Sequence, residues 1–295
     1  MISILIPTYN YNAFPLVSIL HEQLEDEKVD YEIICLDDGS QNFHFENQSI
    51  NSLRNCSYSI LDKNIGRSSI RNLLAKKAKF EHLLFLDADV IPVHENFISN
   101  YLSEIDNEEK AVYGGVRYQE QKPSSTLLLR WIYGKSREAL SAEKRKENPY
   151  LSFLTNSFLI KKNLFEQFQF NENLKNWGHE DTLFSYNLQE NKIKISHIDN
   201  PVVHEGLEDY DIFLNKTRGA INGLADLIEK GLIDPNYIKL SKVYFTLKKF
   251  RLQSAYILFY KLAKPAFLKN LKSNNPSLLI FDLYRLGFLC ILKSN

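Results

Sequence analysis

The 295-residue sequence predicts an α/β fold: an open mixed sheet, mostly parallel, flanked by helices and followed by a C-terminal helical extension. Short apolar runs at 2–6, 31–36 and 82–86 alternate with segments in which apolar residues recur at helical spacing. Such alternation is typical of a sheet with helices on both faces. Hydrophobic residues make up 44% of the chain, which is enough to form a large buried core.

The first strand–helix–strand unit lies at the N-terminal end. The runs at 2–6 and 31–36 end at polar, turn-forming residues, as buried strands do. Between them, Leu16, Leu20 and Leu24 fall on one helical face. Because parallel strands need a crossover of this kind, the unit predicts a parallel pair.

The alternation continues through the first 116 residues. Further strands are predicted at 58–61, 82–86 and 111–116, and helices at 67–79 and from about Phe97. Ligands of such sheets bind outside the carboxyl ends of the strands, so the turns that follow the strands are the first place to look for a site.

The second half of the chain has a less regular pattern. Residues 117–150 are polar, and we expect a long connection with a helix at about 125–145. Further helices are expected at about 180–190 and 209–230, the latter ending at Gly231.

Residues 236–295 form a basic segment with a helical pattern. They contain eleven Lys or Arg and one acidic residue, Asp282, although the formal net charge of the chain is zero. This asymmetry indicates a contact with an anionic membrane surface. The alternative is an ordinary helical subdomain whose lysines face water.

Several function classes lack their motifs. Neither GxGxxG after a strand nor GxxxxGK[ST] occurs, and no nucleic-acid module is recognisable. Three cysteines without a CxxC pair argue against structural zinc and suit a reducing compartment. The N-terminal run is too short for a signal peptide, and no apolar stretch is long enough to span a membrane. We expect a cytoplasmic protein, with a peripheral contact at the inner face of the membrane left open.

Three polar turns follow predicted strands and should converge on one crevice. Their sequences are Pro7-Thr8-Tyr9-Asn10, Asp37-Asp38-Gly39-Ser40 and Asp87-Ala88-Asp89. Two close carboxylates such as Asp87 and Asp89 are costly without a cation, and Mg²⁺ is bound by one or two carboxylates plus substrate phosphates. Taken alone, the pair is somewhat better explained as a solvated turn.

Five segments in a fixed order carry a resemblance to a known family. They are SILIPTYN, IICLDDGS, NIGRSSIRN, FLDADVIP and NWGHEDTLF. In this order they resemble the family 2 inverting glycosyltransferases of the GT-A fold, over roughly residues 1–230. The resemblance implies a hexosyltransferase of polysaccharide biosynthesis. It would move a sugar from a nucleotide-sugar, most often a UDP-sugar, to a glycan or lipid-linked saccharide with inversion, using Mn²⁺ or Mg²⁺.

The resemblance implies nucleotide-binding roles for five residues. Pro7 and Tyr9 would line the nucleobase pocket, and Asp38 would bind the base. Arg71 would help to hold the nucleotide, and its alternative is a solvated charge on a helix. Asp87 would contact the ribose or the metal.

The resemblance also implies a metal site and a catalytic base. Asp89 would bind the metal, together with Asp87 and, as in some relatives, His204; the alternative for His204 is a structural histidine. Asp181 would take the proton of the acceptor hydroxyl, with Glu180 as the second candidate. Their alternative is a favourable position at a helix N-terminus.

Two further residues are assigned to the acceptor and sugar pocket. Trp177 would pack on a sugar face, or else be a core aromatic, and Asn156 would shape the pocket. The expected domains are a GT-A catalytic domain at 1–235 and a basic helical extension at 236–295. The catalytic domain would divide into a nucleotide-sugar half at 1–116 and an acceptor half at 117–235.

An alternative function is a non-catalytic homologue that binds nucleotide-sugar and supports a partner enzyme. Such a protein would be expected to have lost at least one acidic residue of the set. The acidic residues Asp38, Asp87, Asp89 and Asp181 are all present. The sequence therefore favours the enzyme.

Overall fold

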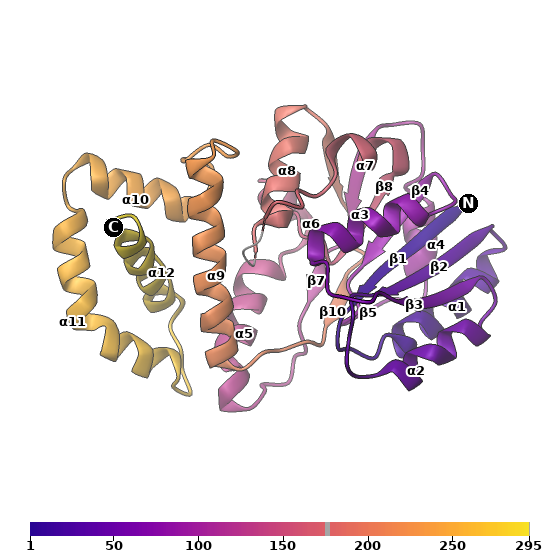
Figure 1. Cartoon of the computed structure of the whole chain (residues 1–295), viewed down its shortest axis with the longest axis horizontal. Helices are drawn as coiled ribbons and strands as arrows, with labels where there is room; N and C mark the ends of the chain where they lie inside the picture. Colours follow the sequence, from indigo (N-terminus) through magenta and orange to yellow (C-terminus); the bar gives the residue numbers. More distant parts are fainter. Residues whose placement is uncertain (175–177, 295) are drawn as a thin grey trace. The chain divides into compact units, whose positions relative to one another are not determined.

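A computed structural model describes residues 1–174 and 178–294 (Figure 1). The chain forms two compact units. The first contains residues 1–119, 138–173 and 180–206. The second contains residues 120–137, the described part of 174–179, and the segment from Leu207 onward.

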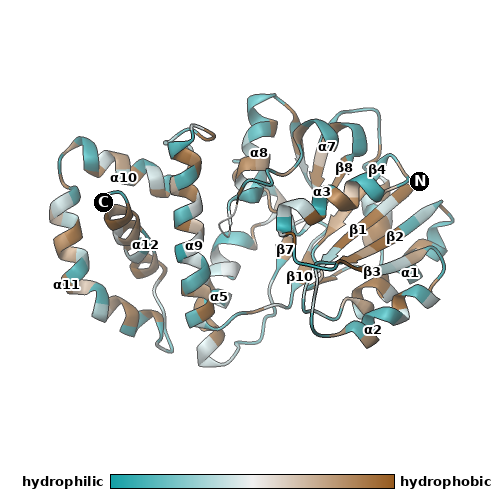
Figure 2. Ribbon diagram, in the orientation of Figure 1, coloured by the Kyte–Doolittle hydropathy of each residue, from teal (hydrophilic) through white to brown (hydrophobic). Residues whose placement is uncertain are grey.

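A seven-stranded sheet forms the centre of the first unit. Its order is β3 (Cys56–Ile60), β2 (Tyr31–Asp37), β1 (Ile2–Thr8), β4 (His82–Leu86), β8 (Ser157–Lys161), β6 (Lys110–Tyr113) and β9 (Lys194–His197). Strands β3, β2, β1 and β4 are parallel neighbours, whereas β8 is antiparallel to both β4 and β6. The predicted mixed, mostly parallel sheet is thus confirmed. Strand β1 appears as a largely hydrophobic ribbon in Figure 2, as expected for a strand covered on both faces.

A second, three-stranded sheet places residues of the site. It contains β5 (Val90–Pro92), β10 (Val202–His204) and β7 (Val116–Arg117). The single strand predicted at 111–116 is therefore divided between two sheets. Gly114 and Gly115 lie at the division, and Gly115 has a φ of +105°. Glycine inside a strand pattern often marks such a bend.

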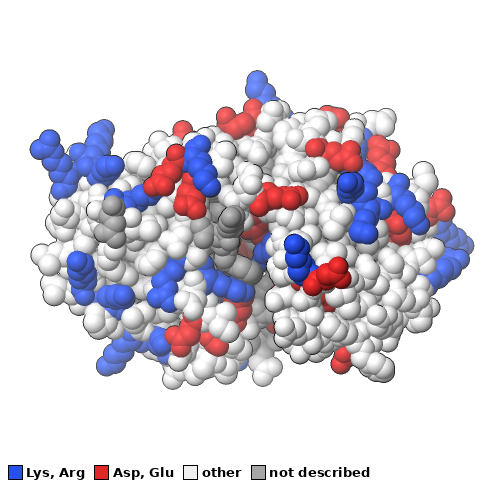
Figure 3. Space-filling model, viewed as in Figure 1, with Lys and Arg blue, Asp and Glu red and all other residues white. Residues whose placement is uncertain are grey.

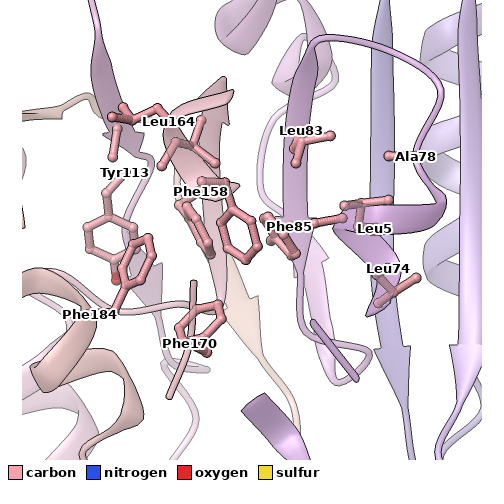
Figure 4. Close-up of a cluster of buried hydrophobic side chains, with 14 of the residues drawn as sticks. Leu5, Leu74, Ala78, Leu83, Phe85, Tyr113, Phe158, Leu164, Phe170 and Phe184 are labelled. Atoms are coloured by element: carbon pink, nitrogen blue, oxygen red, sulfur yellow. The ribbon is translucent and has the colours of Figure 1, made fainter. Parts of the chain in front are cut away.

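Helices cover both faces of the large sheet (Figure 1). Those of the first unit are α1 (Phe14–Glu27), α2 (His44–Gln48), α3 (Arg67–Lys77), α4 (Phe97–Leu102), α6 (Ala142–Lys146), α7 (Lys162–Phe168) and α8 (Glu180–Glu190). An aromatic core lies under α3, α7 and α8 (Figure 4). In it the rings of Phe85 and Phe158 stack with centroids 4.8 Å apart, and those of Phe170 and Phe184 with centroids 4.7 Å apart. This core fixes α3 and α8, which carry site residues, onto the sheet.

The second unit is helical. Its helices are α5 (Leu128–Tyr133), α9 (Tyr210–Glu229), α10 (Lys239–Lys249), α11 (Gln253–Leu271) and α12 (Leu278–Leu292). Helix α12 packs against α9, α10 and α11. Asp209 caps the start of α9, because its side chain accepts hydrogen bonds from the amides of Asp211 and Ile212, and the helix ends just before Lys230 and Gly231. Within the described ranges, no helix is both long and apolar enough to cross a membrane.

The single helix predicted at about 125–145 is wrong. The segment contains α5, a π-helical turn at Gly134–Glu138 and the separate short helix α6. Ser141 caps α6, since its side chain accepts a hydrogen bond from the amide of Lys144. Serine competes for backbone hydrogen bonds inside a helix and favours the position before its first residue. The helical segment therefore ends before Ser141, and a new helix begins after it.

Candidate functional site

The three polar turns lie at one edge of the large sheet, as predicted. They follow β1, β2 and β4, which are parallel neighbours in the order β2–β1–β4. The register pairs Thr8 with Asp37, and the amide of Asp38 donates to the carbonyl of Thr8 at 2.8 Å. The carboxyl ends of the strands therefore bring the turns together.

The first two turns are tied to each other by side chains. The amide of Asn10 donates to Ser40 Oγ at 2.6 Å, and the amide of Gln41 donates to Asn10 Oδ1 at 2.9 Å. Tyr9, which precedes Asn10, is 54% exposed, and Pro7 is half-buried. Tyr9 thus stands at the edge of the sheet with its ring accessible to a ligand.

Asp37 and Asp38 have different partners although they are adjacent. Asp37 is fully buried and accepts hydrogen bonds from the Ser40 amide and the Tyr58 hydroxyl, both at 2.7 Å. Asp38 accepts from the amides of Ile65 at 2.6 Å and Gly66 at 3.0 Å. Asp37 therefore holds its own turn, whereas Asp38 holds the segment that leads into α3.

Two arginines on α3 reach the turn after β4. Arg71 is buried and donates from Nη2 to Asp87 Oδ1, while the Asp87 amide donates to the carbonyl of Asn156 at 3.1 Å. Arg67 Nε lies 2.9 Å from Glu180 Oε1, and its Nη2 lies 3.9 Å from Asp87 Oδ2. The two guanidinium groups connect α3, the end of β4 and the start of α8.

Sequence analysis selected Arg71 and overlooked Arg67. Burial opposes the charge of Arg67, but Glu180, Asp87, Asp181 and Asp89 together raise its pKa. The available indication was its spacing, since Arg67 precedes Arg71 by four residues and so shares its helical face. Four acidic residues from two separate motifs thus act on one guanidinium group.

The two acids at the start of α8 have opposite electrostatic environments. Burial and the neighbouring Glu180 raise the pKa of Asp181 to about 6. Burial acts in the same direction on Glu180, but Arg67 and Arg71 outweigh it and lower the pKa of that carboxyl. A carboxylate whose pKa is about 6 is suited to accept a proton. A carboxylate whose pKa is lowered stays ionised and is suited to bind a cation.

Asp89 and His204 meet across the small sheet. The β5–β10 register pairs Val90 with His204, and the Glu205 amide donates to the Asp89 carbonyl at 2.9 Å. As a result, His204 Nε2 lies 3.5 Å from Asp89 Oδ2. Gly206 adjoins the same carboxylate, because a Cβ there would lie 2.3 Å from Asp89 Oδ2. Sequence analysis did not identify Gly206.

The pair of Asp89 and His204 fits a divalent metal ion. The Asp89 side chain is 32% exposed, and a carboxylate beside an imidazole suits Mn²⁺. In the described parts of the chain, no group of three or more His, Cys, Asp or Glu side chains could hold a metal ion by itself. The remaining ligands would therefore come from elsewhere, as when substrate phosphates complete a Mg²⁺ site. Asp87, the third predicted ligand, is instead paired with Arg71.

The residues predicted for the sugar pocket are only partly placed. Asn156 is buried beside Asp87, and its Oδ1 has no hydrogen-bond partner within residues 1–174 and 178–294. Trp177 lies outside the described residues. Asn156 thus offers one free polar atom near the turn after β4.

Comparison with known proteins decides the family. Residues 3–168 match the model of glycosyl transferase family 2. The chain belongs to glycosyltransferase family 2. The matched region includes Asp38, Asp87 and Asp89, whereas Asp181 and His204 lie beyond it. The large mixed sheet has the GT-A fold.

Individual relatives are more distant. The chondroitin synthase of Escherichia coli is 26% identical over 220 residues, covering 63% of this chain and 32% of that protein. This family 2 chain therefore spans about a third of the length of that relative.

Two solved structures were compared with the chain over its full length. The mannosyltransferase PcManGT of Pyrobaculum calidifontis, solved with GDP-Man and Mn²⁺, has a TM-score of 0.60 at 15% identity; the match covers 100% of this chain and 86% of that one. TarS residues 1–349 of S. aureus have a TM-score of 0.46 at 16% identity, covering 100% and 92%. At 15% identity the first likeness shows the fold.

Proposed function

We propose that this glycosyltransferase moves a hexose from a nucleotide-sugar to a glycan or lipid-linked saccharide, with inversion and with a divalent metal ion. The observation that carries the proposal is the cluster at the sheet edge. Arg67 lies under the influence of Asp87, Asp89, Glu180 and Asp181, which come from the end of β4 and the start of α8. Such a cluster offers a cationic group, a metal-binding carboxylate and a candidate base in one place.

The donor would lie against the turns after β1 and β2. Pro7 and Tyr9 would flank the nucleobase, and Asp38 would accept a hydrogen bond from it in addition to those from Ile65 and Gly66. A carboxylate has about four acceptor positions, so the existing bonds leave capacity for one more. We propose a UDP-sugar; because PcManGT holds GDP-Man, guanosine donors belong in the same assay.

The metal ion, Mn²⁺ or Mg²⁺, would be held by Asp89 and His204 with oxygens of the donor diphosphate. It would supply positive charge to the departing nucleoside diphosphate. Arg71 donates a hydrogen bond to Asp87 and so orients it. Asp87 would contact the ribose or the metal, and Arg71 would help to hold the nucleotide.

Asp181 would act as the base of an inverting displacement. The acceptor hydroxyl oxygen forms a bond to the anomeric carbon while the bond from that carbon to the phosphate oxygen breaks on the opposite face. The hydroxyl proton passes to Asp181, whose raised pKa suits this transfer at neutral pH. Glu180 is the second candidate for this role, and Trp177 and Asn156 would shape the acceptor and sugar pocket.

A panel of UDP- and GDP-sugars with Mn²⁺, Mg²⁺ or EDTA tests the proposal. Asp89→Ala should lose metal-dependent nucleotide binding, whereas Asp181→Asn should bind donor normally and lose transfer. Asp199→Ala removes an exposed acid of the first unit and should leave both unchanged. If the wild type binds a donor but turns over none, the chain is the non-catalytic homologue instead.

We further propose that residues 236–295 contact an anionic membrane surface, which would place the enzyme at the inner face of the membrane. Residues 1–235 would then form the catalytic domain, with its nucleotide-sugar half at 1–116 and its acceptor half at 117–235. The basic composition of the extension supports the contact.

A further inference from the structure

Helices α10 and α11 combine an acid-free sequence with exposed apolar side chains. Residues 235–281 contain nine Lys or Arg and no Asp or Glu. Figure 3 shows Lys and Arg side chains over this part of the second unit. A stretch of this length without a single acid is unusual for a solvated surface, where both signs are normally interspersed.

Helix α11 carries large apolar side chains on both of its faces, with lysines between those on the outer face. Tyr260, Phe267 and Leu271 are buried and belong to the core of the second unit. On the opposite side Leu258 is 62% exposed and Leu262 is 76% exposed. A surface helix normally carries polar residues on that side, and a helix that is apolar all round is normally buried. Helix α12 is also strongly apolar, but it packs against three helices.

The link between α10 and α11 has the same character. Phe250 is 64% exposed and Leu252 is 50% exposed, and both are next to Arg251. Lys248 and Lys249 form the last turn of α10 directly before them. An exposed aromatic residue among basic residues is the composition of interfacial membrane-binding segments.

We propose that the solvent face of α11 and the α10–α11 link insert into the interface of an anionic lipid bilayer. The apolar side chains of this surface, Phe250, Leu252, Leu258 and Leu262, would enter the headgroup region. The flanking lysines and Arg251 would bind lipid phosphates. A second copy of this chain fits less well, because apposing two identical acid-free surfaces would bring like charges together. The inference rests on the proposed function in that it names the surface and the partner of the extension.

The test is flotation of the full chain with vesicles of phosphatidylcholine alone or with 30% phosphatidylglycerol. We expect flotation with the anionic vesicles only. The triple variant Phe250→Ser/Leu258→Ser/Leu262→Ser should reduce it at least tenfold. Lys248→Gln/Lys249→Gln should reduce it by about 25-fold, since each basic residue near an anionic surface contributes about fivefold.

Matched controls come from the first unit. Phe45 is 87% exposed, so Phe45→Ser removes an aromatic side chain that is even more exposed than Phe250. Lys76 and Lys77 form the last turn of α3, as Lys248 and Lys249 do in α10, so Lys76→Gln/Lys77→Gln removes the same charge from an equivalent position. Both controls should float like the wild type.

Two further readouts separate the possible failures. Donor hydrolysis without vesicles should be the same in the wild type and the triple variant, so loss of flotation is read apart from loss of transfer. The inference is overturned if the wild type does not float, or if the triple variant floats equally well. It is also overturned if the wild type elutes as a dimer that the triple substitution dissociates, because the surface is then an interface between copies.

Discussion

At the scale of single residues, adjacent acids perform different tasks because their neighbours differ. Asp37 is enclosed and binds Ser40 and Tyr58, whereas Asp38 binds the backbone before α3. The sequence predicted that this turn would contribute to the site, but it could not distinguish their partners. Apart from Ser40, those partners come from segments more than twenty residues away, so no local pattern contains them.

The raised pKa of Asp181 predicts the pH dependence of transfer. A base must be deprotonated, so kcat should rise with pH through an apparent pKa of about 6 and level above it. The measurement is the pH profile of sugar transfer at saturating donor and acceptor. A rate that does not fall between pH 7 and pH 5 would contradict the role of Asp181.

The same shift predicts a stability change. A carboxyl whose pKa is higher in the folded than in the unfolded state stabilises the fold below about pH 4, and this contribution is lost as the pH rises through about 6. Asp181→Asn should therefore raise the unfolding free energy at pH 8 by about 1–3 kcal/mol relative to its effect at pH 4. Urea titrations at the two pH values measure the difference, and an equal effect at both would contradict the shift.

Gly206 predicts a steric test of the metal site. A methyl group at this position would lie 2.3 Å from Asp89 Oδ2, so Gly206→Ala must displace the carboxylate. We expect metal-dependent donor binding to weaken at least tenfold. In the Asp89→Ala background, Gly206→Ala should add nothing, and an undiminished further loss there would show that it acts elsewhere.

At the scale of elements, the parallel strands β3, β2, β1 and β4 and most of the longer helices were predictable, whereas strands β8 and β9 and the small second sheet were not. Strands β1, β2 and β4 contain continuous apolar runs, and His82–Leu86 has the predicted bounds of β4. Strands β5, β7 and β10 are two or three residues long, too short for a periodic pattern. The contact of His204 with Asp89 depends on that small sheet, so only the resemblance suggested it.

The aromatic core predicts the stability of the first unit. Phe158 is fully buried and its ring stacks on Phe85, so Phe158→Ala should cost about 3–5 kcal/mol of unfolding free energy. Phe45→Ala removes an 87% exposed ring and should change it by less than about 0.5 kcal/mol. Urea denaturation measures both, and similar costs at the two positions would contradict the assigned core.

At the scale of the whole molecule, charge is distributed unevenly along the chain. The basic segment at 236–295 was evident from composition, because the charge of a continuous segment is counted directly from its sequence. Its exposed apolar surface was not evident, since Leu258 and Tyr260 are both large apolar residues of one helical segment. Only the packing shows that Leu258 is exposed and Tyr260 is buried. Likewise, the sequence predicted a shared crevice for the acidic turns, but only the folded structure shows that Arg67 lies among them.

The central claim is that Asp89 and His204 bind a divalent ion together with a sugar nucleotide. Calorimetric titration of UDP and GDP into the protein, with Mn²⁺ or with EDTA, tests it most directly. We predict that one nucleotide binds only when Mn²⁺ is present, that Asp89→Ala abolishes this dependence and that His204→Ala weakens it. Equal nucleotide affinity with Mn²⁺ and with EDTA, or an unchanged titration for Asp89→Ala, would contradict the claim.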